Sequence, residues 1–237
     1  MHQEIENRIS RRSFLNEPLT EQQRQEIGAY IREQNAVSQL TVSFLEDGSC
    51  AFGNIKTTYG MFSNVRSMLL LKGRADMPDL KEKIGYYGED LALFLTGMGL
   101  GTCWVGGTYD KEALDVRPDE ELVCVLLVGK VKKASVKEKL LRSTLRGKVK
   151  SIQERMIADR PLPQWVRDGM QAVLLAPSAR NSQKTVFRFE NGQISAQIKD
   201  DYRFDLVDLG IAKKHFEIEA GGRFDWGNGG VFHPAQT

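Results

Sequence analysis

Cysteine and histidine are scarce in this sequence. The 237 residues include three cysteines, Cys50, Cys103 and Cys124, which are odd in number and widely spaced, so they predict neither a disulfide framework nor a zinc site. His215 and Glu219 lie one turn apart on a predicted helix, but no third ligand is apparent, so we expect a pair on a helix face and no metal site. The reducing cytoplasm is the simplest compartment for such a chain, and we expect the protein there.

Long apolar runs are missing as well. No run approaches the ~20 residues of a membrane-spanning helix. The opening residues, MHQEIENRISRR, have no apolar signal-peptide core, and we expect no membrane association. With 41% hydrophobic and 27% charged residues, the composition is typical of a soluble globular protein. The length fits one large domain or two small domains packed together.

Aromatic residues are absent from the strongly basic segment of residues 130–150. The net charge is +2, yet residues 130–150 hold nine lysines and arginines and one acidic residue, Glu138. The rest of the chain has 24 basic and 30 acidic residues, so a basic segment on an acidic body favours an anionic partner. A solvated basic helix over residues 136–146 explains the pattern equally well. Without interleaved aromatics the segment does not fit a single-stranded nucleic-acid platform, and we expect no nucleic-acid partner.

Hydrophobic periodicity and turn residues predict alternating helices and strands. A capping box at Thr20 and Gln23 opens one helix, and an Asn191-Gly192 turn marks a hairpin. Helices are predicted over residues 21–34, 79–98 and 205–220, and strands over 40–45, 67–72, 122–128, 186–189 and 194–198. Trp226 is expected in the core.

A glycine-rich stretch at residues 97–101, GMGLG, follows one of these helices. A dinucleotide-binding fingerprint instead follows a strand and opens a helix, so we interpret the glycines as a helix end and reject a Rossmann domain. Beyond them, Gly106 and Gly107 permit close approach of the backbone to a planar ligand. Cys103 has no histidine nearby in the sequence, which favours an inert buried thiol. Trp104 suits a position beside a ligand, in the core or at an interface.

Two further stretches are rich in hydrogen-bond donors. Arg11-Arg12-Ser13 suits a phosphate, because guanidinium groups donate in pairs and the serine adds another bond, although such triplets are commonly only solvated surface. Pro177 ends a predicted helix. The donors that follow it are Ser178, Arg180, Asn181, Ser182 and Gln183. Such a cluster can line a polar ligand or merely close a turn.

Three motifs together resemble the FMN-dependent nitroreductase family. They are ISRRSF at residues 9–14, GLGTCWVGG at 99–107 and APSARNSQ at 176–183. The resemblance implies an α+β fold with a mixed sheet flanked by helices. It also implies an FMN-dependent oxidoreductase that passes hydride from NADH or NADPH, through the flavin, to a small acceptor such as a nitroaromatic or a quinone. The flavin supplies that chemistry, so no catalytic acid or base is assigned. The alternative is a non-catalytic flavin- or anion-binding protein that retains the site without turnover.

The resemblance further implies which residues contact the cofactor. The phosphate ligands would be Arg11, Arg12 and Ser13, with Lys132 or Lys133 assisting. A second group consists of Pro177, Ser178, Asn181 and Gln183, of which Ser178 and Asn181 would meet the ribityl chain or ring edge. A third group comprises Thr102, Cys103, Trp104, Val105 and Gly106. The backbone near Trp104 to Gly106 would donate toward the O4–N5 edge of the ring, where negative charge develops on reduction.

The second half of the sequence resembles the first. SQLTV at residues 38–42 matches SQKTV at 182–186, at a shift of 144 residues. In the family, two subunits usually build each flavin site, one with the arginine and glycine motifs and the other with the proline-serine motif. Here residues 1–147 carry the first two motifs and residues 148–237 the last, while Glu154-Arg155-Met156 replaces the arginine motif in the second half. We therefore expect an internal pseudo-dimer with one intact site, which binds one FMN per chain without a second chain.

Overall fold

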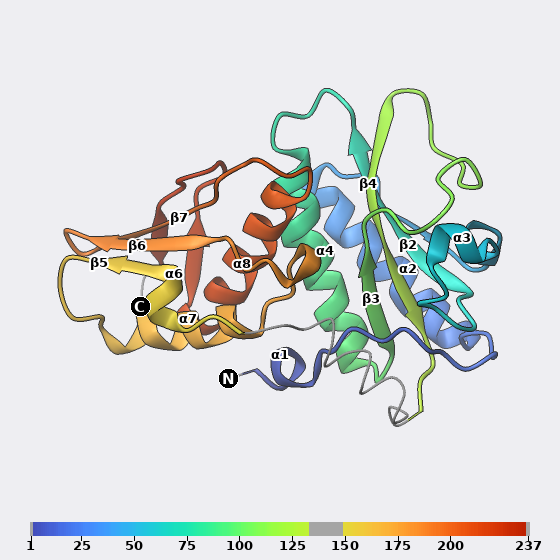
Figure 1. Ribbon diagram of the computed structural model, residues 1–237, viewed down its shortest axis with the longest axis horizontal. Helices are drawn as coiled ribbons and strands as arrows, with labels where there is room; N and C mark the ends of the chain where they lie inside the picture. The colour runs from blue at the N-terminus through green and yellow to red at the C-terminus, as the bar shows by residue number, and fades with distance from the viewer. Residues whose placement is uncertain (1, 133–148, 236–237) are drawn as a thin grey trace. The chain divides into compact units, whose positions relative to one another are not determined.

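The computed structural model describes residues 2–132 and 149–235, and it combines helices with β-sheets (Figure 1). The chain forms two compact units. The N-terminal unit comprises Asn7–Leu80 and Leu91–Thr144, and the C-terminal unit comprises Met1–Glu6, Lys81–Asp90 and Leu145–Thr237. Helix α4 (Leu80–Gly97) therefore contributes its first turns to the C-terminal unit and its last turns to the N-terminal unit.

The N-terminal unit is built on a four-stranded antiparallel sheet. Its strands are β1 (Ser43–Leu45), β2 (Ser67–Arg74), β3 (Gly101–Val105) and β4 (Glu120–Gly129), in the order β1-β2-β4-β3. In the central pair, Met68 lies opposite Leu127 and Leu70 opposite Val125, and these four side chains belong to one hydrophobic cluster. Leu69 and its alternating neighbours face the other way and are fully buried too. Both faces are covered, which explains why the two central strands have almost continuous apolar sequences.

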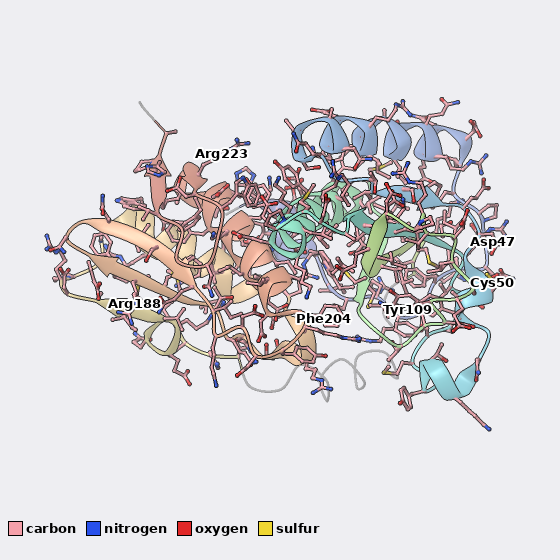
Figure 2. The ribbon with its side chains drawn as sticks, turned by 90° about the horizontal axis from the view of Figure 1, so that it is seen from above. Asp47, Cys50, Tyr109, Arg188, Phe204 and Arg223 are labelled. Carbon is pink, nitrogen blue, oxygen red and sulfur yellow. The ribbon has the colours of Figure 1, made fainter. Side chains whose placement is uncertain are left out.

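Helices and short turns complete this unit. Helix α2 (Glu21–Ser38) begins at the predicted capping box, with reciprocal bonds between Thr20 and Gln23. It continues past the predicted end at Gln34 and stops where Gln39 adopts a left-handed φ of 63°. The short elements are α1 (Gln3–Asn7), which lies across the unit boundary, η1 (Ser49–Phe52) and α3 (Ile55–Thr58). Figure 2 shows α2 along one side of the N-terminal unit and Cys50 and Tyr109 on the side away from it.

The glycines at residues 97–101 end α4, as predicted. The helix stops at Gly97, and Gly99 follows with φ +75°. A strand, β3, then begins at Gly101, so this stretch does not have the strand-to-helix order of a dinucleotide-binding turn. The GLGTCWVGG motif is thus mostly an edge strand, with Gly106 and Gly107 directly after it.

The C-terminal unit packs two helices beside small sheets. Its elements are α6 (Ile152–Arg155), β5 (Met156–Ala158), α7 (Gln164–Leu175), η2 (Ala179–Asn181), β6 (Val186–Glu190), β7 (Gln193–Gln197), α8 (Asp205–Ala220), β8 (Gly222–Phe224) and β9 (Phe232–Pro234). β5 runs parallel to β6, and β6 runs antiparallel to β7 through the predicted Asn191-Gly192 turn. Helices α7 and α8 lie side by side (Figure 1). The rings of Phe187 and Phe216 stack between sheet and helix at 5.3 Å.

The first turns of α4 pack closely on α8 within the C-terminal unit. A Cβ on Gly85 would lie 2.0 Å from the carbonyl oxygen of Val207, so only glycine permits this backbone contact. The crossing also buries an ion pair, in which Lys213 Nζ lies 2.5 Å from Glu82 Oε1. Lys213 donates further bonds to the carbonyl groups of Asp225 and Gly227, which satisfies a buried ammonium group.

Most predicted elements are confirmed, and the α+β fold class is confirmed with them. The predicted helix over 205–220 matches α8, and the mixed strand direction occurs in the β5-β6-β7 sheet. The prediction for Trp226 is wrong, because its side chain is 41% exposed. It packs against the rings of Tyr86 and Tyr87 at the surface of the unit, at 5.3 and 6.0 Å. Among the described residues, no helix has both the length and the apolarity needed to cross a membrane.

Candidate functional site

The arginine motif and the glycine motif meet in the N-terminal unit. The backbone N–H of Arg11 donates to the carbonyl oxygen of Thr102 at 2.7 Å, and Ser10 forms a parallel bridge with Thr102. Leu15 N–H donates to the carbonyl oxygen of Lys130 at 2.9 Å, so the segment of residues 10–15 also contacts the chain just after β4. Two motifs that are about 90 residues apart in sequence are therefore adjacent in the fold.

Two glycines make this approach possible. A Cβ on Gly101 would lie 2.3 Å from Val131 Cγ1 and 3.0 Å from Arg11 Cγ. A Cβ on Gly129 would lie 2.9 Å from Phe14 Cδ1. Since real Cβ atoms do not approach so closely, side chains at these positions would push the arginine motif away from the sheet.

Arg11 joins the motif to the predicted basic residues after β4. Its guanidinium Nη2 donates to the carbonyl oxygen of Lys132 at 2.5 Å, and its side chain is buried. The Lys132 residue is exposed and Arg12 is half-buried. Arg11 thus holds the backbone of Lys132 by a hydrogen bond and places a buried positive charge next to it. Lys133 and most of the basic segment, including the helix expected over 136–146, lie outside the described residues.

Ser13 has partners that the sequence did not reveal. Ser63 Oγ donates to Ser13 Oγ at 3.0 Å, and Ser63 N–H donates to the carbonyl oxygen of Arg12 at 2.9 Å. Asn64 Nδ2 donates to the carbonyl oxygen of Phe14 at 3.0 Å. No local motif marks Ser63 or Asn64, because their partners lie about 50 residues earlier in the chain. The structure therefore adds a second hydroxyl, that of Ser63, to the residues expected to bind the phosphate.

Strand β3 presents its two faces differently. Cys103 is 2% exposed and belongs to the hydrophobic cluster beneath the sheet, which fits the interpretation as an inert thiol. Trp104 is half-buried on the opposite face, since side chains alternate along a strand. β3 is the last strand of its sheet, and the Thr102 carbonyl points outward to Arg11. By the same alternation, the backbone groups of Trp104 point toward that outer edge.

The proline-serine motif lies in the C-terminal unit and has an unusual backbone. Helix α7 ends at Leu175, ahead of Pro177 as predicted. Arg180, Asn181 and Gln183 have φ values of 55°, 53° and 48°. Residues with a Cβ rarely adopt this left-handed region, and three of them in four positions persist only when surrounding contacts hold them.

Those contacts come from the loop itself and from α8. The Asp208 carboxylate accepts the N–H of Ala179, at 2.9 Å to Oδ1 and 3.1 Å to Oδ2, and Ser182 Oγ approaches Oδ2 at 3.4 Å. Ser178 Oγ accepts the N–H of Gln183 at 3.0 Å. We refer to residues 178–183, held in this way, as the serine loop.

Gln183 connects the serine loop to the chain before α6. Its Oε1 accepts the N–H of Lys150 at 2.9 Å, and its Nε2 donates to the carbonyl oxygen of Asn181 at 3.2 Å. The side chain is buried, whereas Ser178 and Asn181 are half-buried. Gln183 therefore supports the loop from below, and Ser178 and Asn181 lie nearer its surface.

Buried charges lie beneath the serine loop. Burial raises the pKa of Asp208 to about 7, and the neighbouring Asp205 adds to the rise, while the Ala179 N–H, Ser182 and Arg155 oppose it. Burial lowers the pKa of Arg155 to about 10, so this guanidinium stays charged at neutral pH. Arg155 donates to the carbonyl oxygens of Thr185 and Val173 at 3.2 and 2.9 Å. Arg155 therefore links α6 to α7 and to the residue before β6, in the segment that replaces the arginine motif in the second half.

The His215 and Glu219 side chains turn to different partners. His215 Nε2 lies 2.9 Å from Glu89 Oε1, and Nδ1 lies 3.0 Å from the carbonyl oxygen of Ala172. Glu219 accepts the backbone N–H of His2. Within residues 2–132 and 149–235, no group of three or more His, Cys, Asp or Glu side chains is arranged to hold a metal ion.

The predicted site residues thus form two groups. The arginine motif, Thr102 and Lys132 are joined by hydrogen bonds in the N-terminal unit, and the serine loop is organised separately in the C-terminal unit.

Comparison with known proteins identifies the family. A family model described as "Putative TM nitroreductase" matches residues 1–220. A solved "putative nitroreductase" from Thermotoga maritima shares 22% identity, covers 97% of this chain and 90% of its own, and has a TM-score of 0.63. An FMN-dependent nitroreductase from Clostridium difficile shares 15% identity over 56% of this chain and 88% of its own, with a TM-score of 0.45. No curated protein matches significantly. The match over nearly the whole chain shows that the protein belongs to the nitroreductase family.

Proposed function

We propose that the protein is an FMN-dependent oxidoreductase that takes hydride from NADH or NADPH and passes electrons to a small acceptor, such as a nitroaromatic or a quinone. The observation that carries the proposal is the hydrogen-bonded junction of Arg11, Thr102 and Lys132. It supports the proposal because it gathers cationic and hydroxyl groups beside an edge strand, in a chain of the nitroreductase family.

The donors at this junction fit a phosphate group. Arg12 and Lys132 supply cations near the surface, and Ser13 and Ser63 supply a pair of hydroxyls 3.0 Å apart. Charged donors and hydroxyls together suit the several oxygens of a phosphate monoester. In this proposal Arg11 contributes charge from below and fixes the backbone of Lys132.

The outer edge of β3 is proposed to orient the flavin ring. When bound, the flavin supplies the hydride chemistry, and the protein supplies binding, orientation and electrostatics. Backbone N–H groups near Trp104 to Gly106 would donate toward the O4–N5 edge and stabilise negative charge there. The Cys103 side chain lies in the core cluster, so in this proposal Cys103 is a neighbour of the flavin whose thiol takes no part in the reaction.

The serine loop is proposed to contact the ribityl chain or the ring edge. Ser178 and Asn181 would make these contacts, with Pro177 fixing the start of the loop. Gln183 would act from below, through its bonds to Lys150 and Asn181. The left-handed backbone supports this assignment, since such strain is commonly retained where a loop serves a ligand.

An anaerobic reduction experiment tests the proposal. The purified protein, reconstituted with FMN, should show flavin absorbance that bleaches when NADPH or NADH is added without oxygen, and a nitroaromatic or quinone should restore the colour. A bound flavin that stays oxidised with both nucleotides would instead support the non-catalytic binder. Failure to bind FMN would refute the oxidoreductase and the flavin-binding alternative.

A further inference from the structure

We propose that Asp208 is a positioning residue that holds the serine loop in the conformation in which it contacts the flavin. This inference rests on the proposed function for the contact with flavin, but not for the hold on the loop. Asp208 lies on α8 and is 29 residues from Ala179, whose N–H it accepts with both carboxylate oxygens.

The geometry makes Asp208 a clamp at the start of the strained backbone. Ala179 directly precedes Arg180 and Asn181, the first two residues with left-handed φ. Ser182 approaches the same carboxylate from the far side of that turn at 3.4 Å. One carboxylate therefore bridges both ends of the segment that must be kept in an unfavourable conformation.

The groups that face Asp208 decide when the clamp is charged. From its own helix, Asp205 lies one turn earlier and accepts Lys184 Nζ at 3.1 Å, and its Oδ1 is buried without a hydrogen-bond partner among the described residues. Arg155 of α6 carries a positive charge, which lowers the pKa of Asp208 and so opposes the effect of Asp205. Lys150, before α6, donates to the carbonyl oxygen of Gln183 at 3.1 Å on the same loop.

Ionisation of Asp208 should therefore control the loop near neutral pH. The ionised carboxylate accepts the Ala179 N–H with both of its oxygens, whereas the protonated acid has less negative charge and fewer acceptor sites. Because burial raises the pKa of Asp208 to about 7, the clamp should weaken as pH falls from 8 to 6. FMN affinity should fall over the same range.

The test compares wild type with Asp208→Asn, using Asp168→Asn as the matched control. Asp168 is half-buried on α7, where it accepts a bond from Gln164, so its substitution removes a carboxylate away from the loop. Two quantities are measured from pH 6 to 8.5: the exchange protection factor of the Ala179 amide in flavin-free protein, and the dissociation constant for FMN. Wild type and Asp168→Asn should lose protection and affinity together as pH falls.

At pH 8, Asp208→Asn should show about tenfold lower protection of Ala179 and about tenfold weaker FMN binding, the effect of losing one charge-assisted bond. Both quantities should then vary little with pH, while the variant stays folded. Wild-type protection in Asp208→Asn would overturn the clamp. Reduced protection with unchanged FMN affinity would overturn the positioning role. If wild type bound no FMN, the proposed function would fail, and Ala179 protection alone would still decide whether Asp208 holds the loop.

Discussion

Gly85 of α4 and Gly210 of α8 occupy equivalent places at one helix crossing. A Cβ on Gly85 would lie 2.0 Å from the carbonyl oxygen of Val207, and a Cβ on Gly210 would lie 2.0 Å from that of Glu82. Each glycine therefore meets the residue three positions before the other glycine. Such reciprocal contacts are the mark of a two-fold relationship between two segments.

The ion pairs at the same crossing repeat this reciprocity. Glu89 pairs with His215 at 2.9 Å, and its sequence neighbour Asp90 pairs with Lys214 at 2.5 Å. Both pairs and both glycine contacts fit one correspondence, in which the first residue of α4, Leu80, matches the first residue of α8, Asp205. This local symmetry supports, as a proposal, two related halves at residues 1–147 and 148–237.

The backbone conformation of one residue in each of the two matching sequences supports the same proposal. Gln39 of SQLTV and Gln183 of SQKTV both have left-handed φ, at 63° and 48°. Each precedes a strand, β1 or β6. Equivalent residues with the same uncommon conformation are expected of a duplicated segment and are not required by the sequence match alone.

The glycine crossing gives a first prediction. Gly85→Ala should destabilise the fold by at least about 1–3 kcal/mol, because its methyl group would meet backbone and not a movable side chain. Gly28→Ala is the matched control: it also lies within a helix, but its Cβ would meet only Arg32 Nη1 at an ordinary 3.5 Å. The control should be neutral or more stable by up to about 1 kcal/mol, through helix propensity. Urea unfolding of both variants checks the difference, and equal stabilities would contradict the close crossing.

The arginines expected to bind the FMN phosphate give a second prediction. Replacing Arg11 and Arg12 together with Ala should weaken FMN binding at least about tenfold, since charged hydrogen bonds contribute roughly 1.5–3 kcal/mol each. Arg188→Ala is the control, because Arg188 lies on β6 and pairs with Glu190. Fluorescence titration with FMN measures the change. Affinity unchanged in the double variant would remove these arginines from the site.

The sequence predicted elements whose signals are local. The capping box at Thr20 and the Asn191-Gly192 turn each lie within a few residues, and both are confirmed. Helix α2 extends beyond the predicted Gln34 because Gln34 and Ser38, though polar, are buried. Local periodicity does not report that burial.

The parts that escaped prediction depend on distant partners. Ser63 contacts a motif about 50 residues earlier, and Asp208 contacts a loop 29 residues earlier, so neither position carries a recognisable pattern. Trp226 looked like a core residue from its type alone. It lies beside Tyr86, more than 130 residues away in the sequence, and is partly exposed.

A third prediction concerns Cys103. Because the thiol is 2% exposed and belongs to the core cluster, Cys103→Ser should keep most of the rate of NADH or NADPH oxidation while lowering the melting temperature. Steady-state kinetics on flavin-loaded protein measures the rate. A hundredfold loss in kcat, which corresponds to about 2.7 kcal/mol, would instead indicate a direct role for the thiol.

A fourth prediction concerns stability and pH. Asp208 has an unfolded pKa of about 3.9, whereas burial raises its folded pKa to about 7. Between these values the folded protein binds a proton that the unfolded chain does not, so this group's contribution to stability falls as pH rises from about 4 to about 7. Asp208→Asn removes that dependence. Relative to wild type it should gain on the order of 2 kcal/mol between pH 5 and pH 8, since each pKa unit is worth about 1.4 kcal/mol and relaxation reduces the full shift. Urea unfolding at both pH values measures the gain, and a constant difference would contradict it.

The last prediction concerns stoichiometry, because the proposed halves are not equivalent. The arginine motif occurs at residues 11–13, while the corresponding position of the second half has Glu154-Arg155-Met156, and there Arg155 is buried and bonded to backbone carbonyls. The second half therefore lacks a set of phosphate-binding side chains like that of residues 11–13. We expect one FMN per chain, whereas an ordinary symmetric dimer has two equivalent sites. Flavin absorbance per chain at saturation, combined with light scattering, measures this ratio and the mass of the flavin-bound species. Arg160 is exposed, pairs with Asp159 and lies near residues 154–156. Arg160→Ala should leave the flavin-to-chain ratio and the affinity for FMN unchanged. Two flavins per chain, or binding only by an assembly of two chains, would contradict the proposal of two fused halves while leaving the family assignment intact.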